Sequence, residues 1–230
     1  SRRGCEITLS VVPESPSTMD VTRSDAPPYS QSWRCMISTE RPAIQALLLA
    51  LVIVLIWIWY YGKTTLAAWR APLSPSGDYL LFLGYLKAYM DGDIGLLLLK
   101  IVAHLNAPFT ANWNDYPLTV EIVPAVFGLL ARWTGLLVAS NLMYLSAHIL
   151  AGVSFWCAGL LLRYRWSYVW AGSLLYAFSP YIIARNALQH PTLSYYWHLP
   201  LLVVAVGWIL NGDVSRDRFK NGFCWAVSLI

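Results

Sequence analysis

The sequence predicts an all-α protein, a polytopic bundle of transmembrane helices with a long external first loop of interfacial helices. Of its 230 residues, 57% are apolar and only 12% are charged, whereas a soluble domain has roughly 45 to 50% and about 25%. The apolar residues form several runs long enough to cross a bilayer as helices. Twelve Trp and fourteen Tyr are more than core packing needs and are typical of side chains at the membrane–water interface.

Residues 1–40 are predicted to be a disordered cytoplasmic tail. They are rich in Ser, Pro and Thr, with scattered charges and no hydrophobic periodicity, so they cannot bury enough apolar surface to offset the entropy lost on ordering. Either Met19 or Met36 could be the true start of the chain. No signal-peptide pattern ends in a small-residue cleavage site here, so we expect the first apolar run to remain as an anchor.

Residues 41–230 are predicted to form part of a transmembrane domain that begins with a span at about 43–61. Nineteen residues at 1.5 Å rise cover about 28 Å, close to the hydrocarbon thickness of roughly 30 Å. Trp and Tyr crowd the C-terminal end of this run, as they do at an interface. Arg34 and Arg41 precede it, which favours a cytoplasmic N-terminus in the cell (plasma) membrane.

Further spans are predicted at about 136–162, 168–183 and 193–210, followed by the start of a fifth at Phe223. Basic residues cluster at 163–165 and 216–220, where an even number of crossings returns the chain to the cytoplasm. The external loop 63–135 and the segment 185–191 should then share the outer face. Because the chain stops inside a fresh apolar run, we expect it to be a fragment whose C-terminal part is missing.

The external loop is predicted to carry three short helices on the membrane surface, at 79–90, 94–105 and 118–130. Each is about three turns long and mostly apolar, interrupted by a charged residue or a His, which is typical of a helix half sunk in headgroups. The last of them could instead be a span, which would invert everything after it. Its length of about thirteen residues and its Glu121 and Pro124 favour an interfacial helix.

The candidate site residues are ionisable side chains predicted at the outer face: Asp78, Asp115, Glu121, Arg185 and His190. Each also has a structural interpretation. Asp78 would serve well as a helix N-cap, and Asp115 as a turn former. Glu121 can be solvated on its helix. The two basic residues can be a snorkelling side chain and a helix-end cap.

The order of these features is the strongest clue to function. An inside-to-outside span precedes a long external loop with an early acidic residue and surface helices; a second span ends in Arg163-Tyr164-Arg165; and Phe178-Ser179-Pro180-Tyr181 is followed by Arg185 and His190. This arrangement, over residues 43–210, resembles the N-terminal part of the GT-C superfamily of membrane glycosyltransferases.

The resemblance implies an enzyme that transfers a sugar from a polyprenyl-phosphate or polyprenyl-diphosphate donor to a glycan, lipid or protein acceptor on the outer face. In that family an acidic residue of the first loop binds or deprotonates the acceptor, and Asp78 occupies its place. The acidic pair of the protein mannosyltransferase branch is absent, since Tyr79 follows Asp78. The acceptor class and any requirement for a divalent metal therefore stay open.

The chemistry explains why such residues are needed. Displacing a lipid phosphate from an anomeric carbon requires a base or positioning group for the acceptor hydroxyl, and a cation to stabilise the departing phosphate. The Asp78 carboxylate can do the first. The Arg185 guanidinium can do the second by bidentate contact, with His190 beside it.

Other functions fit the sequence less well. The net charge of +4 forms no continuous basic stripe, so nucleic acid is not an expected partner. The four cysteines show neither metal spacing nor a disulfide framework. His148 and His198 lie in apolar runs, where we expect hydrogen bonds to neighbouring helices. The alternatives are a lipid or sugar transporter, which would show an internal repeat and midplane ionisable groups, and a non-catalytic assembly subunit.

Overall fold

The computed structural model describes residues 42–73, 78–95, 101–102, 111–112, 122–188, 190–212 and 218–228. They belong to one compact unit, Arg41–Ile230. The predicted tail, 1–40, lies outside the described residues, and so do Asp115 and Glu121.

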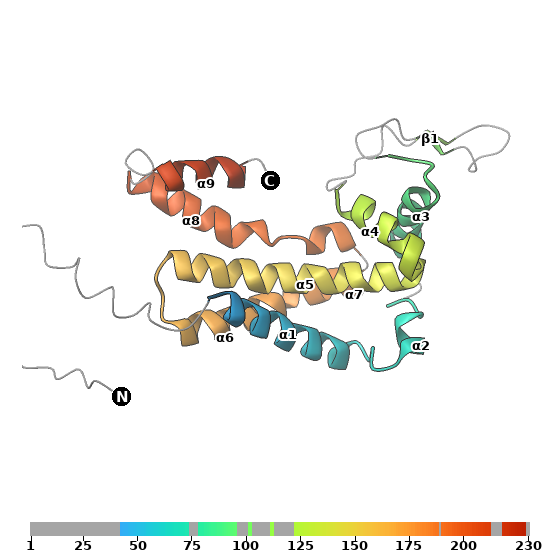
Figure 1. Ribbon diagram of the computed structural model, residues 1–230, viewed down its shortest axis with the longest axis horizontal. Coiled ribbons are helices and arrows are strands. Elements are labelled where there is room, and N and C mark those ends of the chain that lie inside the picture. The colour runs from blue at the N-terminus through green and yellow to red at the C-terminus, as the bar shows by residue number, and fades with distance from the viewer. Residues whose placement is uncertain are drawn as a thin grey trace, which may run out of the picture. The chain divides into compact units, whose positions relative to one another are not determined.

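The described residues are mainly helical, as predicted (Figure 1). The helices are α1 (Pro42–Tyr60), α2 (Leu66–Trp69), α3 (Asp78–Asp91), α4 (Ile122–Thr134), α5 (Leu136–Leu161), α6 (Trp166–Ala177), α7 (Pro180–Ala187), the 3-10 helix η3 (Pro191–Ser194), α8 (His198–Leu210) and α9 (Arg218–Ser228). A short antiparallel pair joins β1 (Ile101–Val102) to β2 (Ala111–Asn112), with Ile101 opposite Asn112.

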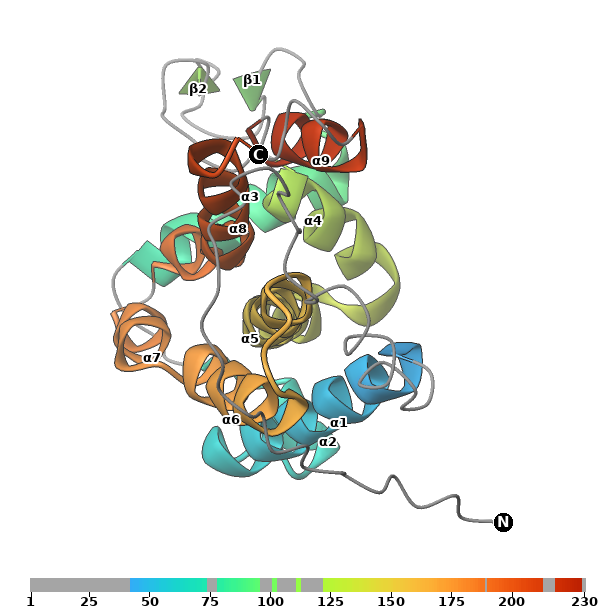
Figure 2. The same ribbon diagram turned by 90° about the vertical axis from the view of Figure 1, so that its left-hand side faces the viewer.

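Helix α5 lies at the centre of the bundle, and the other helices pack around it (Figure 2). Helix α1 runs antiparallel to it, because Ile53 packs near Trp156 whereas Trp57, one turn later, packs near Met143. The two helices touch closely at Gly152, where an added Cβ would lie 2.4 Å from the Ile53 Cδ1. Small residues allow such close approach between apolar helices.

Helices α1 and α5 are the two in the described part of the chain that are long and apolar enough to cross a membrane. They match the predicted spans 43–61 and 136–162. Helix α1 buries Leu49, Ile53 and Trp57 against the bundle and exposes its other leucines. An apolar face of this size is unusual on the surface of a soluble monomer.

The predicted helix 94–105 is wrong. Helix α3 ends at Asp91, where Gly92 takes a φ of 84°, and the described residues after it include the strand β1. Ile94 and Val102 are buried against Tyr85 and Ala125 of α3 and α4. A short apolar run that contains β-branched residues has no periodicity that separates helix from strand, so burial decided its structure. Helices also form at the other two predicted positions, as α3 and α4, although α4 begins at Ile122.

The predicted span 168–183 is two helices, α6 and α7. Helix α6 ends at Ala177, and Ser179 caps α7 by accepting a hydrogen bond from the Ile182 N–H at 3.5 Å. Pro180 lacks an N–H and favours the first turn of a helix, so it begins α7 and cannot continue α6. The break lies beside His148, midway along α5.

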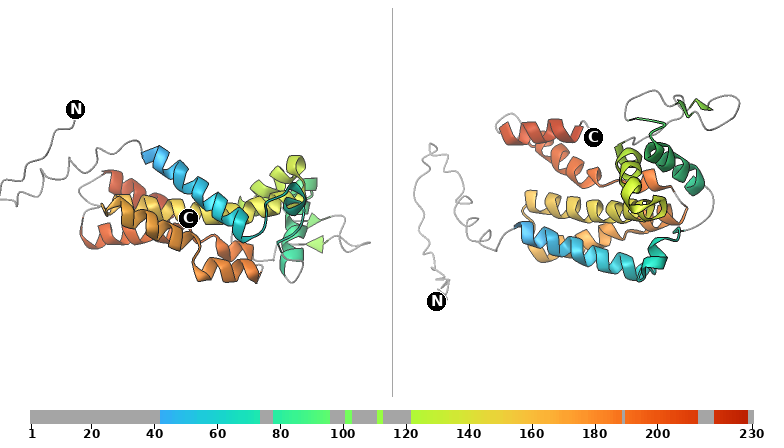
Figure 3. Two further views of the ribbon diagram at one scale, coloured as in Figure 1. Left: turned by 90° about the horizontal axis from the view of Figure 1, so that it is seen from below. Right: turned by 45° about the vertical axis from the view of Figure 1, so that its right-hand side comes forward.

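The predicted span 193–210 is also interrupted, because α8 begins only at His198 and η3 and a short non-helical link precede it. Alone, α6 and α8 are about 18 and 20 Å long at 1.5 Å per residue, well short of a bilayer's roughly 30 Å. Each has a second short helix next to it in the chain: α7 follows α6, and η3 precedes α8. Figure 3 shows α6 and α7 beside α5. The helix that contains Phe223, α9, begins earlier than the predicted fifth span, at Arg218.

Candidate functional site

The candidate site lies in the part of the bundle that we name the loop end. It is where α2, α3, α7 and η3 pack against the N-terminal half of α5, residues 136–148. Tyr79 of α3, Ile182 of α7 and Tyr195 after η3 belong to one buried cluster with Met143 of α5. Tyr79 also accepts a hydrogen bond from the Ser140 hydroxyl at 3.2 Å. Burial raises the pKa of the Tyr79 phenol, although this hydrogen bond opposes the rise.

Asp78 is the first residue of α3. The structure describes its backbone and not its side chain, so its contacts remain predictions. Its neighbour Tyr79 is fully buried in the loop-end cluster. Asp78 therefore begins its helix at the loop end, a position compatible with both of its predicted roles.

Arg185 and His190 also lie at the loop end. The Arg185 guanidinium sits over the Tyr181 ring, 5.1 Å from its centroid, a favourable cation–π arrangement. The backbone N–H of His190 donates to the backbone carbonyl of Arg185 at 2.9 Å, which holds the two residues close together. Among the described side chains, no carboxylate pairs with Arg185. Ile182 and Asn186 are the buried residues of α7, whereas Arg185 is only partly buried.

The break between α6 and α7 leaves backbone carbonyls that need donors. Pro180 cannot donate to the Tyr176 carbonyl, four residues earlier. That carbonyl accepts instead from the Ser179 N–H at 3.2 Å and from the Tyr196 hydroxyl at 2.8 Å, and the Tyr196 hydroxyl also lies 2.6 Å from Ser179 Oγ. In return, the Tyr176 hydroxyl donates to the Tyr196 carbonyl at 3.1 Å. This reciprocal pair joins the end of α6 to the link before α8, so the two interruptions face each other.

A second set of hydrogen bonds starts at the next carbonyl. The Ala177 carbonyl accepts from His148 Nδ1 at 2.7 Å, and His148 Nε2 lies 2.9 Å from Asn186 Nδ2. Asn186 Nδ2 also donates to the Tyr61 hydroxyl at 3.2 Å, while its Oδ1 accepts from the Ser194 hydroxyl at 2.7 Å. We name these residues, His148, Asn186, Ser194 and Tyr61, the break network.

The donors and acceptors of the break network match one another. A carbonyl can only accept, so His148 carries its proton on Nδ1, and its Nε2 accepts from the Asn186 amide. The same amide orientation leaves Oδ1 free to accept from Ser194. Each polar atom at the centre of this network thus has a partner, as buried polar groups require.

Helix α2 is held at the loop end by two side chains. Lys63 is buried, and its ammonium donates to the carbonyls of Ala68 and Ala71 at 2.8 and 2.9 Å. Burial lowers the pKa of the Lys63 amine. The Asn141 amide of α5 donates to the carbonyls of Trp69 and Ala71 at 2.7 and 3.0 Å. These bonds satisfy the last carbonyls of α2, where cations also complement the helix dipole.

Three buried polar atoms of the loop end have no hydrogen-bond partner in the described part of the chain: Trp57 Nε1, Tyr144 Oη and Asn141 Oδ1. They are polar groups inside the buried cluster that no described side chain satisfies. Acid–base chemistry would need a carboxylate from outside this buried group, such as Asp78. Within the described ranges, no three His, Cys, Asp or Glu side chains could together hold a metal ion.

Sequence reasoning found part of this site. We expected His148 to hydrogen-bond to neighbouring helices, and it does. Asn186 and Ser194 were missed, as was the Tyr176–Tyr196 pair. One signal was available, since a proline four residues after Tyr176 frees that carbonyl and demands a donor from elsewhere.

Comparisons with known proteins assign no family to this arrangement. No protein-family model matches the chain, and searches of the curated proteins and of the solved structures also find no match. The function is therefore argued from the residues themselves.

We predict that Tyr196→Phe destabilises the bundle by about 1 kcal/mol, because the Tyr176 carbonyl loses its side-chain donor and keeps only the Ser179 N–H. Thermal unfolding of the purified chain in detergent measures this. Tyr181→Phe is the matched control. The Tyr181 ring packs against the same Tyr196 ring, while its hydroxyl has no hydrogen-bond partner in the described structure. Equal unfolding temperatures for the two variants would show that the hydroxyl bond contributes nothing.

Proposed function

We propose that this chain is part of a polytopic membrane glycosyltransferase of the GT-C type. It transfers a sugar from a polyprenyl-phosphate-linked donor to an acceptor on the outer face of the cell membrane. The loop end is its outer side and holds the site. One observation carries the proposal: the break at Pro180 packs α7, which bears Arg185, onto the half of α5 that also holds the start of α3, which bears Asp78.

The interrupted segments support a membrane setting. A bilayer core offers no water to free carbonyls, so non-helical backbone at that depth must be hydrogen-bonded within the protein. The break after α6 meets this condition through His148 and Tyr196. On this proposal α6 with α7, and η3 with α8, make the third and fourth crossings. The basic residues beyond α5 and around the start of α9 then lie in the cytoplasm.

Arg185 is the residue best suited to the donor phosphate. It lies on a short helix at the loop end, it is only partly buried, and no described carboxylate neutralises it. A guanidinium without an anionic partner is costly in a membrane setting. A phosphate removes that cost and accepts two parallel hydrogen bonds. The ring of Tyr181 holds the guanidinium plane in place, and His190 is fixed to the same turn.

Asp78 is the proposed base or positioning group for the acceptor hydroxyl. Its neighbour Tyr79 is anchored to α5 by the Ser140 hydrogen bond, which supports a fixed position for the start of α3. Asp115 and Glu121 lie outside the described residues and stay candidates for substrate binding. A divalent metal remains compatible with the sequence, and its ligands would include carboxylates of the loop.

A lipid or sugar transporter is the second candidate, and one observation favours it. Facing interruptions in two crossings, like those near Ser179 and Tyr196, are typical of transporter binding sites. The two functions differ in their product. A transporter moves the lipid-linked sugar intact, whereas a transferase cleaves its glycosidic bond, so release of the polyprenyl phosphate in a proteoliposome separates them.

We predict that Asp78→Asn lowers the rate of sugar transfer by a factor on the order of 10² to 10⁴, as expected for loss of a general base. The change keeps the size of the side chain and leaves α3 intact. A transfer assay with radiolabelled lipid-linked sugar measures it. Asp91→Asn, at the other end of the same helix, loses only an exposed pair with Lys87 and should transfer normally. Near-normal transfer by Asp78→Asn would exclude the catalytic role.

We predict that Arg185→Lys weakens donor binding while the fold stays intact, and that Arg185→Ala weakens it more. Lysine keeps the charge but loses the planar fork that binds phosphate in bidentate fashion. The KM for the donor reports the change. Arg70→Lys is the control, since Arg70 is exposed at the same end of the bundle. An unchanged donor KM in both Arg185 variants would remove Arg185 from the site.

A further inference from the structure

An apolar groove of about 410 Å³ lies at the end of the bundle opposite the loop end. Its walls come from α5, α6, α8 and the turn that joins α5 to α6; they include Phe155, Tyr164, Tyr168, Leu199 and Val203. The lining is almost entirely apolar. A groove of this kind between membrane helices would be filled by hydrocarbon.

Two exposed arginines adjoin the lining residues of this groove. Arg163 and Arg165 come directly before and after Tyr164, which lines it. The Arg165 guanidinium lies 5.9 Å from the centroid of the Tyr168 ring, another lining residue. Among the described side chains, neither arginine has a carboxylate partner. The turn at this end of the groove therefore carries two positive charges that no described side chain neutralises.

Arg163 lies at an unusual backbone position. Helix α5 ends in a Schellman motif, in which the Tyr164 N–H donates to the Gly159 carbonyl at 3.0 Å and the Arg163 N–H to the Leu160 carbonyl at 3.0 Å. Such a motif needs a positive φ and usually has glycine there. Arg163 takes a φ of 59°, and the other described residues with positive φ are glycines. Arg163 thus occupies a position where the backbone favours glycine.

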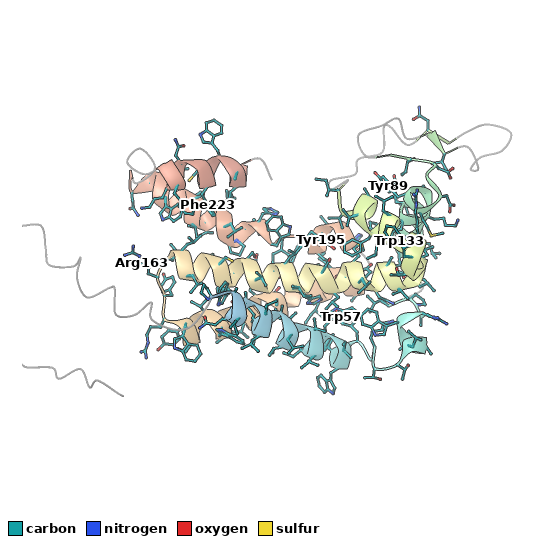
Figure 4. The ribbon with its side chains drawn as sticks, in the orientation of Figure 1. Trp57, Tyr89, Trp133, Arg163, Tyr195 and Phe223 are labelled. Atoms are coloured by element: carbon teal, nitrogen blue, oxygen red, sulfur yellow. The ribbon has the colours of Figure 1, made fainter. Side chains whose placement is uncertain are left out.

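We propose that this groove binds one acyl chain of an anionic phospholipid from the cytoplasmic leaflet, with the lipid phosphate held by Arg163 and Arg165. Charge complementarity identifies the occupant: an apolar groove with two arginines at one end fits a chain that ends in an anionic headgroup. Figure 4 shows Arg163 at the end of α5 away from Tyr195, which marks the loop end. The site is therefore distinct from the proposed donor site at Arg185.

This inference rests on the proposal that α5 crosses the membrane with its C-terminal end inside. It does not depend on sugar transfer. An inner-leaflet lipid seated between α6 and α8 would fill the space between two short helices. It would hold them against the C-terminal half of α5.

Native mass spectrometry of the purified chain tests the proposal. The probes are phosphatidylglycerol and phosphatidylcholine with identical acyl chains, added in equal amounts. We expect one phosphatidylglycerol to be retained per chain, with about a tenfold preference over phosphatidylcholine, because each arginine near an anionic headgroup contributes to binding. The double variant Arg163→Gly, Arg165→Gln should lose the preference. Its glycine suits the positive φ, so the helix end is preserved.

A second pair of variants tests the groove itself. Val203→Trp places a large ring in the groove, and Val206→Trp, one turn further along α8, lies outside the lining residues. Retention should fall severalfold in the first and stay unchanged in the second. Equal effects of the two tryptophans would overturn the proposal. So would equal retention of the two phospholipids by the wild-type chain.

Two further outcomes also decide the matter. Displacement of phosphatidylglycerol by polyprenyl phosphate at equal concentration would assign the groove to the donor lipid and overturn the phospholipid proposal. The chain could also retain phosphatidylglycerol, show the predicted effects of the variants, and have no transfer activity. That outcome would uphold this inference while the proposed enzyme function failed.

Discussion

The structure depends on one constraint: backbone carbonyls freed inside an apolar bundle must find donors. Pro180 begins α7 beside the middle of α5 and has no N–H for the Tyr176 carbonyl. That carbonyl accepts from the Ser179 N–H and the Tyr196 hydroxyl, and the Ala177 carbonyl accepts from His148. The first side-chain bond joins this break to the link before α8, and the second orients the imidazole that contacts Asn186.

This constraint divides the bundle into two functional halves. Beyond the break, α7 and η3 replace continuous helices, and they make room for polar and ionisable side chains beside α3. On the other side of the break, α6 and α8 cover the C-terminal half of α5 with apolar side chains. The apolar groove lies between these helices. The proposed chemistry of the donor phosphate and the proposed seat of a structural lipid are thus at opposite ends. Each end has its own arginines, Arg185 in one and Arg163 with Arg165 in the other.

Composition and periodicity predicted the helical class and the two long helices; α5 ends within one residue of its predicted bound. They failed where long-range contacts decide. The run 94–105 forms the strand β1 because Ile94 and Val102 find a buried place against α3 and α4. The late start of α8 depends on a tyrosine pair twenty residues apart. The predicted span 168–183 is broken at Pro180, and the donor for the Ala177 carbonyl beside this break is His148 of another helix.

The most direct test of the two interrupted crossings is thiol labelling with an impermeant reagent on intact cells. Single cysteines replace Asn112, Leu188, Tyr164 and Asn211 in a chain whose four native cysteines are changed to serine. Labelling at positions 112 and 188 from outside, and at 164 and 211 only after permeabilisation, is the predicted result. If position 188 were labelled from the same side as positions 164 and 211, neither α6 with α7 nor η3 with α8 would cross the membrane.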